Sequence, residues 1–176
     1  MFDLICKSEM ILSVQKFTQK YTIGHFMDGL PEVYEYSMED WPPHITLADV
    51  FSVDGDSSNL IENLREKLST VKPVQTKIIC EDWFGDHKSI HVRLLDKTTD
   101  FQRLHDEIVD VLKNLGCKFN NPEFTEDGFK PHLTVQKDGK LEIGDNLTID
   151  TITLIDMFPN DDFKKRKVLG TIKFDE

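Results

Sequence analysis

Two histidines in this chain, His44 and His132, each stand two residues before a threonine, Thr46 and Thr134 respectively. Both histidines follow a proline, and in both motifs an apolar residue separates histidine from threonine and another follows the threonine. Judged from composition, the chance of meeting this fuller pattern twice is roughly one in 10⁵ or less. Either histidine alone would suit an ordinary strand, whereas two in matched surroundings indicate catalysis.

The paired motifs suit the in-line cleavage of a phosphodiester. A base must take a proton from the attacking oxygen, and an acid must protonate the oxygen that leaves on the far side of phosphorus. An imidazole with a pKa of about 6.5 can do either near neutral pH, and threonine hydroxyls can hold the phosphate oxygens. We therefore expect His44 and His132 to be catalytic without a metal ion, in unassigned acid and base roles, and Thr46 and Thr134 to bind phosphate.

The alternation of side chains along a strand predicts how each motif is presented. Residues two apart share a face, so His44 and Thr46 emerge together while Ile45 points to the other side. Lys130 precedes His132 by the same spacing. We expect Lys130 to share the face of His132 and to bind the phosphate as well.

Other polar groups admit more than one interpretation. His91 and Arg93 share the polar face of a predicted strand, which is turned either to a cleft or to solvent. The basic run from Lys164 to Lys167 is either a solvated loop or strand end, or a patch that contacts phosphate. The three cysteines lie far apart without a Cys-x-x-Cys spacing, which predicts neither disulfides nor a zinc site and favours a reducing setting. We expect no cofactor.

The pattern of apolar residues predicts an α+β chain. Alternating or short apolar runs favour strands, and apolar residues three and four apart favour helices. The N-terminal part is predicted to be a strand, a helix and then an irregular connection over 24–43 with one short strand at 33–36. The predicted strands span 2–6, 44–51, 74–81, 89–96, 132–136, 147–157 and 168–174, the predicted helices span 8–21, 57–71 and 99–115, and turns are predicted at 54–56 and 85–86.

The sequence contains an internal repeat whose two copies lie half a chain length apart: Trp-Pro-Pro-His-Ile-Thr-Leu at 41–47 and Phe-Lys-Pro-His-Leu-Thr-Val at 129–135. On these motifs, and on the order of helices and strands between them, the chain resembles the 2H phosphoesterase superfamily, the LigT-like or 2'-5' RNA ligase-like proteins. The resemblance implies an α+β, bilobal and pseudo-symmetric fold. It also implies a single domain over residues 1–176, in which two antiparallel sheets line a central cleft with helices outside. Many of these proteins carry an arginine near the second motif, where this chain has Lys130 and Lys137.

The net charge of −11 bears on the partners of the chain. It opposes the capture of duplex DNA or long RNA and favours a substrate of one to a few nucleotides. The N-terminal residues show neither the pattern of a signal peptide nor that of a membrane span. We expect a cytoplasmic monomer that binds a small nucleotide or a short oligonucleotide.

Three functional hypotheses follow. The first is a metal-independent phosphodiesterase that hydrolyses a 2'-linked phosphodiester, either a 2',3'-cyclic phosphate or a 2'-5' bond, in a small, short or cyclic nucleotide. The second is a viral or host-defence enzyme that degrades immune messengers such as cyclic dinucleotides or 2'-5' oligoadenylates. The third, from a different class, is a nucleotide-binding module without turnover.

Overall fold

The computed structural model describes residues 19–31, 34–53, 57–135 and 141–175. Within these ranges the chain forms ten strands, two α-helices and five short 3-10 helices. The strands are β1 (Lys20–Phe26), β2 (Glu35–Ser37), β3 (His44–Ser52), β4 (Val74–Phe84), β5 (Ile90–Leu95), β6 (Lys118–Phe119), β7 (His132–Thr134), β8 (Asn146–Ile149), β9 (Thr151–Asp156) and β10 (Lys165–Lys173). The helices are α1 (Ser58–Lys67), α2 (Thr99–Asn114), η1 (Met38–Asp40), η2 (Asp86–Lys88), η3 (Pro122–Phe124), η4 (Glu126–Gly128) and η5 (Pro159–Asp161).

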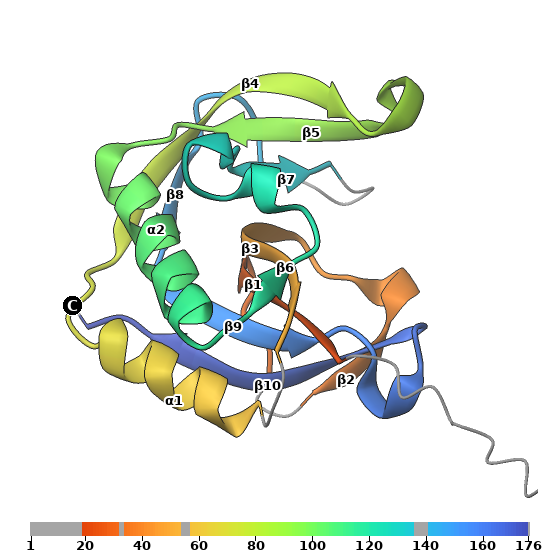
Figure 1. Ribbon diagram of the computed structural model, residues 1–176. Coiled ribbons are helices and arrows are strands. Elements are labelled where there is room, and N and C mark those ends of the chain that lie inside the picture. The colour runs from red at the N-terminus through yellow and green to blue at the C-terminus, as the bar shows by residue number, and fades with distance from the viewer. Residues whose placement is uncertain (1–18, 32–33, 54–56, 136–140, 176) are drawn as a thin grey trace, which may run out of the picture.

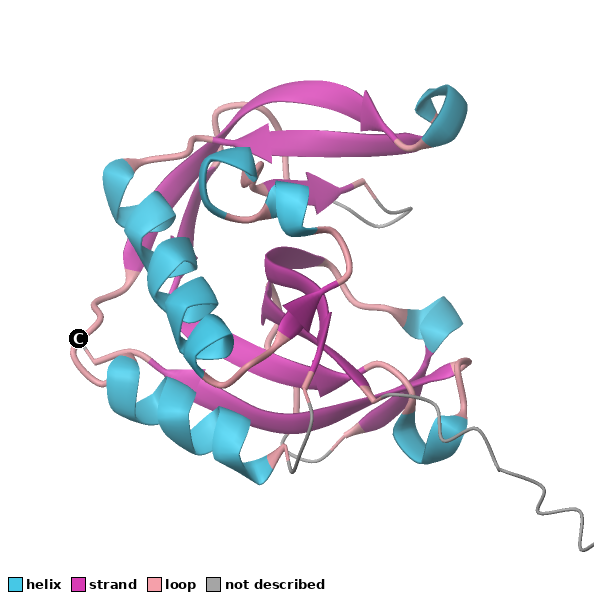
Figure 2. Cartoon of the chain, viewed as in Figure 1, coloured by secondary structure: helices cyan, strands magenta, loops and turns pink. Residues whose placement is uncertain are grey.

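The strands join into one hydrogen-bonded series in which every pair is antiparallel. Their order is β2-β10-β9-β1-β3-β7-β5-β4-β8, with β6 added beside β3. β9 and β10 lie on one side of the molecule, and β4 and β5 lie on the opposite side (Figures 1 and 2). The prediction of two separate sheets is therefore corrected. The two motif strands, β3 and β7, pair with each other and so join the two halves of the chain.

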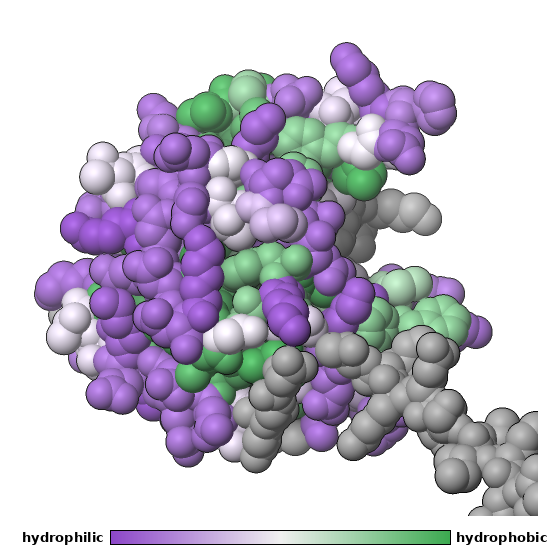
Figure 3. Space-filling view, in the orientation of Figure 1, coloured by the Kyte–Doolittle hydropathy of each residue, from purple (hydrophilic) through white to green (hydrophobic). Residues whose placement is uncertain are grey.

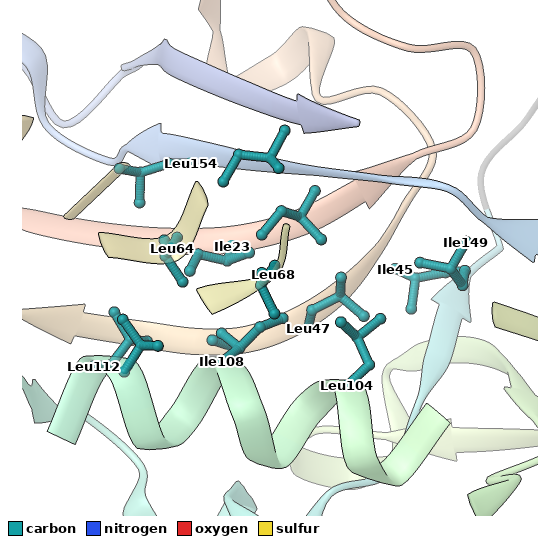
Figure 4. Packing of buried hydrophobic residues seen from close by; sticks show 14 of the residues in the cluster. Ile23, Ile45, Leu47, Leu64, Leu68, Leu104, Ile108, Leu112, Ile149 and Leu154 are labelled. Atoms are coloured by element: carbon teal, nitrogen blue, oxygen red, sulfur yellow. The ribbon is translucent and has the colours of Figure 1, made fainter. Parts of the chain in front are cut away.

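The hydrophobic core lies where α1 and α2 pack against the strands. Leu104, Ile108 and Leu112 recur every four residues along α2, so they project from one face of that helix, and each is at most 1% exposed. They point toward Leu47 of β3 and Leu68, which follows α1 (Figure 4). Because full burial of such a side chain stabilises the fold by about 2 kcal/mol, this contact fixes the position of β3 and of the first motif.

The first described residues, up to Phe26, differ from the sequence prediction. The sequence predicts a helix through Tyr21 and an irregular connection from Gly24, but both residues lie in β1. β1 is flanked by β3 and β9, and its six residues from Tyr21 to Phe26 are all buried. A strand buried on both faces loses the period-two pattern that identifies strands in a sequence. The predicted elements over 2–6 and 8–18, the turn at 54–56 and residue 136 lie outside the described residues.

Most of the later elements confirm the prediction, with shifted bounds. The predicted strand 147–157 is two strands, β8 and β9, which separate at Asp150. The chain turns there because β8 pairs with β4 in one half, whereas β9 pairs with β1 and β10 in the other. β10 begins at Lys165, three residues before its predicted start at 168.

The face shown in Figure 3 is mostly hydrophilic, with a smaller group of apolar residues near its middle. This surface agrees with the high charged content of the sequence, 30% of all residues. In the described part of the chain, neither α-helix has the length and apolar character needed to cross a membrane.

The loop that carries η3 and η4 depends on a glycine. A Cβ placed on Gly128 would lie 1.8 Å from the carbonyl oxygen of Glu123. We expect Gly128→Ala to lower the free energy of unfolding by about 3 kcal/mol, because the loop must open to admit the methyl group. Chemical denaturation measures this change.

Gly29→Ala is the matched control. Gly29 has a φ of 68° but open space where its Cβ would lie, so this variant tests backbone strain alone, at about 1 kcal/mol. Equal losses in the two variants would contradict the close approach at Gly128.

Candidate active site

The two motifs meet where β3 and β7 pair. Ile45 is the partner of Leu133 in this antiparallel pair, and both side chains are buried, at 0% and 4% exposed. One position outward in each direction, the register sets Thr134 opposite His44 and His132 opposite Thr46. These four side chains therefore share the face opposite Ile45 and Leu133, with directly opposed Cβ atoms about 5 Å apart.

Both imidazoles are held by the same backbone contact. Nδ1 of His44 lies 2.8 Å from the carbonyl oxygen of Pro42, and Nδ1 of His132 lies 2.8 Å from the carbonyl oxygen of Lys130. A carbonyl oxygen only accepts, so Nδ1 must donate in each ring. In the neutral imidazole this leaves the lone pair on Nε2, which is then the nitrogen able to accept a proton.

The surroundings of the two rings differ. The ring of His44 stacks on Phe26, with 5.2 Å between centroids, and the Trp41 indole N–H reaches both of its nitrogens. Because Nδ1 already donates to the backbone, it is Nε2 that accepts from Trp41, at 2.7 Å. The ring of His132 instead meets the edge of Phe84, with 4.9 Å between centroids.

The pKa of His44 is lowered to about 4, chiefly by burial; the bond to the Pro42 carbonyl opposes this shift, and the nearby His132 adds to it. A desolvated imidazole disfavours its charged form. His44 is therefore neutral at pH 7, with the Trp41 indole N–H in contact with its ring nitrogens.

The guanidinium group of Arg166 packs against the indole ring of Trp41. Its guanidinium carbon lies 5.2 Å from the centroid of the Trp41 ring. The side chain is only 6% exposed, and Nη1 donates to three carbonyl oxygens, those of Met157, Phe163 and Lys165. In the basic run 164–167, Lys164 and Lys165 are exposed at the start of β10, whereas Arg166 is a buried structural cation.

A pocket of about 490 Å³ opens beside the motifs. Of the five predicted site residues, Thr46, His132 and Lys130 line it. His44 and Thr134 do not, and His44 lies beneath Trp41. Lys130 is exposed and makes no ion pair with any described residue. The structure thus brings the two motifs together on one face and places the lysine at the same pocket.

His91 and Arg93 point away from this pocket. Where β5 pairs with β7, Val92 lies opposite Thr134 and Leu94 lies opposite His132. Val92 and Leu94 therefore share the face of the motifs, and the residues that alternate with them lie on the other face. On the other face, His91 and Arg93 both contact the carboxylate of Glu81, each at 3.3 Å. Neither residue is placed to reach a substrate held by the motifs.

Two further histidines have structural partners. Nδ1 of His25 lies 3.0 Å from the carbonyl oxygen of Thr151. Nδ1 of His105 lies 2.7 Å from the carbonyl oxygen of Leu47, and its Nε2 accepts from the backbone N–H of Glu126 at 3.0 Å. Burial lowers the pKa of both rings. Among the described residues no three His, Cys, Asp or Glu side chains form a group that could hold a metal ion.

The pocket includes residues that the sequence did not single out. Asp49 has the wrong parity to share a face with Thr46 in a regular strand, yet both line the pocket. The adjacent residues Ile23 and Gly24 of β1 pair with Ala48 and Thr46, so Leu47 is an extra residue on β3. Such a β-bulge shifts the alternation by one and turns Asp49 to the motif side. No sequence signal marks this irregularity.

The fold and the motif pair agree with the comparisons to known proteins. The sequence profile of the 2'-5' RNA ligase superfamily matches residues 12–151. The chain therefore belongs to this superfamily, that of the LigT-like 2H phosphoesterases. None of the curated proteins compared matches the chain.

Solved structures with a similar fold include members of this group. LigT from E. coli complexed with 3'-AMP is 12% identical, with a TM-score of 0.55 over 90% of this chain and 99% of LigT. The protein TT0787 of Thermus thermophilus is 13% identical, with a TM-score of 0.55 over 88% of this chain and 97% of its own. A third structure, described as a phosphoesterase, is 14% identical, with a TM-score of 0.53 over 90% of this chain and 99% of its own. At these identities the likeness establishes the shared fold.

The protonation of His44 can be measured directly. We expect its Cε1–H resonance to titrate with a midpoint near pH 4, because burial disfavours the imidazolium. In Trp41→Phe the midpoint should rise but stay below 6.5, since the indole N–H that favours neutral Nε2 is lost while most of the ring remains. NMR titration of the histidine resonances follows both.

Trp83→Phe serves as the control, because this exposed tryptophan stacks on His91 instead. It should leave the midpoint of His44 unchanged. A wild-type midpoint at or above 6.5 would contradict the environment described for His44.

Proposed function

We propose that this protein is a metal-independent phosphodiesterase that hydrolyses a 2'-linked phosphodiester, a 2',3'-cyclic phosphate or a 2'-5' bond, in a small nucleotide. The observation that carries the proposal is the pairing of Ile45 with Leu133, which sets both His-x-Thr motifs on one face. Two imidazoles with equivalent backbone anchors and two hydroxyls there supply the groups that in-line cleavage requires.

The difference between the histidines supports an assignment of roles. His44 is neutral at pH 7, so its Nε2 is suited to take the proton from an attacking water. His132 then protonates the leaving oxygen, while Thr46 and Thr134 donate to the non-bridging oxygens. For water to reach Nε2 of His44, it must replace the indole N–H of Trp41. A bound anionic phosphate raises the pKa of His44 and so makes it a stronger base in the complex.

Pocket size and charge support a small nucleotide as the substrate. A volume of about 490 Å³ lies within the range of small-molecule sites. The net charge of −11 disfavours long polyanions, which bind through many phosphate contacts. LigT, which shares the fold, has been solved with 3'-AMP, ATP and NADP+, and we extend nucleotide binding to this chain as part of the proposal.

The test is turnover in the presence of EDTA. We expect the wild-type protein to hydrolyse 2',3'-cyclic mononucleotides or 2'-5' dinucleotides, and His44→Ala and His132→Ala each to lose at least about 10²-fold in kcat. Products resolved by mass spectrometry identify the bond that is cut.

The matched control is His91→Ala, because His91 lies on the opposite face of β5 beside Glu81, and it should keep full activity. Unchanged turnover in either motif variant would rule out the two-histidine mechanism. Tight binding of intact nucleotides without hydrolysis would instead identify a binding module.

Lys130 gives a separate prediction. We expect Lys130→Ala to raise KM about fivefold with little change in kcat, because an exposed charge contact with the phosphate is worth about 1 kcal/mol. The effect should shrink as salt is added, since salt screens exposed charges. Lys67→Ala in α1 is the control for loss of one positive charge, and an equal rise in KM there would refute the phosphate contact.

A further inference from the structure

The pocket extends past the motifs to a pair of polar side chains at the far end of β3. Asn121 Nδ2 donates to Asp49 Oδ2 at 2.6 Å, and both residues are half-buried and line the pocket. The pair continues the antiparallel register of β3 with β6, in which Phe51 opposes Phe119. The next backbone bond in that direction runs from the Asn120 N–H to the Val50 carbonyl at 2.8 Å. The position of the pair is thus set by the sheet.

Three aromatic residues accompany this pair and the motifs in the pocket. Phe84, Phe124 and Phe129 line the same pocket. Phe124 is 53% exposed although the residue is large and apolar, and Phe129 is fixed by stacking on His105, with 3.9 Å between centroids. The chain between β6 and β7, which carries η3 and η4, runs from beside β3 to β7 (Figure 1), and Phe124 and Phe129 belong to this segment. An exposed aromatic ring such as that of Phe124 is the usual stacking surface for a nucleobase.

The charges in the pocket favour one orientation of a bound nucleotide. Lys130 stands next to the second motif, whereas Asp49 lies beyond Thr46 on β3, on the other side of the bulge at Leu47. An anionic group is therefore favoured at the lysine, and hydrogen-bond donors are favoured at the carboxylate.

We infer that Asp49, oriented by Asn121, reads the edge of the nucleobase and favours bases with an exocyclic amino group over uracil; this inference rests on the proposed function. A carboxylate only accepts hydrogen bonds. Asn121 holds one of its oxygens, and the other accepts from the amino group of adenine, cytosine or guanine. Uracil presents carbonyl oxygens on both sides of its one N–H, and the carboxylate repels them.

The experiment compares the four 2',3'-cyclic mononucleotides as substrates, and 3'-AMP with 3'-UMP as ligands in calorimetry. We expect the wild-type protein to prefer the amino-bearing bases over uracil by about tenfold, as for one hydrogen bond to a charged group. Asp49→Asn keeps the size of the side chain and its bond with Asn121 but presents an amide donor to the base. It should abolish the preference or reverse it toward uracil. Asp110→Asn, on the exposed side of α2, controls for the loss of one negative charge.

Turnover and binding separate this inference from the proposed function. A base preference that disappears in Asp49→Asn supports the inference, even if it is seen only in binding and no substrate is cut, in which case the proposed catalysis fails alone. Hydrolysis of all four substrates at equal rates, or a preference that Asp49→Asn leaves intact, overturns the inference and leaves the proposed function standing. Absence of both binding and turnover overturns both.

Discussion

The pairing of β3 with β7 decides which side chains the two His-x-Thr motifs present together on one face. Ile45 and Leu133 are buried partners in that pair, and exposing either side chain to water would cost about 2 kcal/mol of free energy. A slip of one residue in either strand would turn its whole set of side chains to the other face. Burial of two aliphatic residues therefore holds the polar residues of both motifs toward the pocket, and the core and the candidate active site share one constraint.

Two motifs of nearly equal sequence acquire different chemistry from their surroundings. Each imidazole donates from Nδ1 to the carbonyl two residues before it, so both rings have the same backbone hydrogen bond and the same tautomer. Trp41 and Phe26 then enclose His44, while His132 faces the pocket beside Phe84. The pseudo-symmetry of the sequence thus supplies a matched pair, and burial makes the imidazole of His44 a weaker base than an exposed histidine.

The sequence predicts β3 and both motifs because His44 and Thr46 alternate with buried Ile45, and it predicts α2 because Leu104, Ile108 and Leu112 repeat every four residues. It cannot predict β1, since burial on both faces removes the alternation, nor the joining of the two halves, which depends on pairing between strands far apart in the chain. The burial of Arg166 could not be predicted either, because a buried arginine and an exposed one look the same in a basic run of sequence. Asp49 was missed because a bulge leaves no mark in the residue pattern.

The extra residue at Leu47 separates β3 into two stretches that can change independently. The stretch before it, with His44 and Thr46, is fixed by β7, whereas the stretch after it, with Asp49, is fixed by β6. A related chain one residue shorter at this point would keep its histidine and threonine in place but rotate the carboxylate out of the pocket. Deletion of a single codon would thus alter the lining of the pocket without disturbing the two motif side chains on β3.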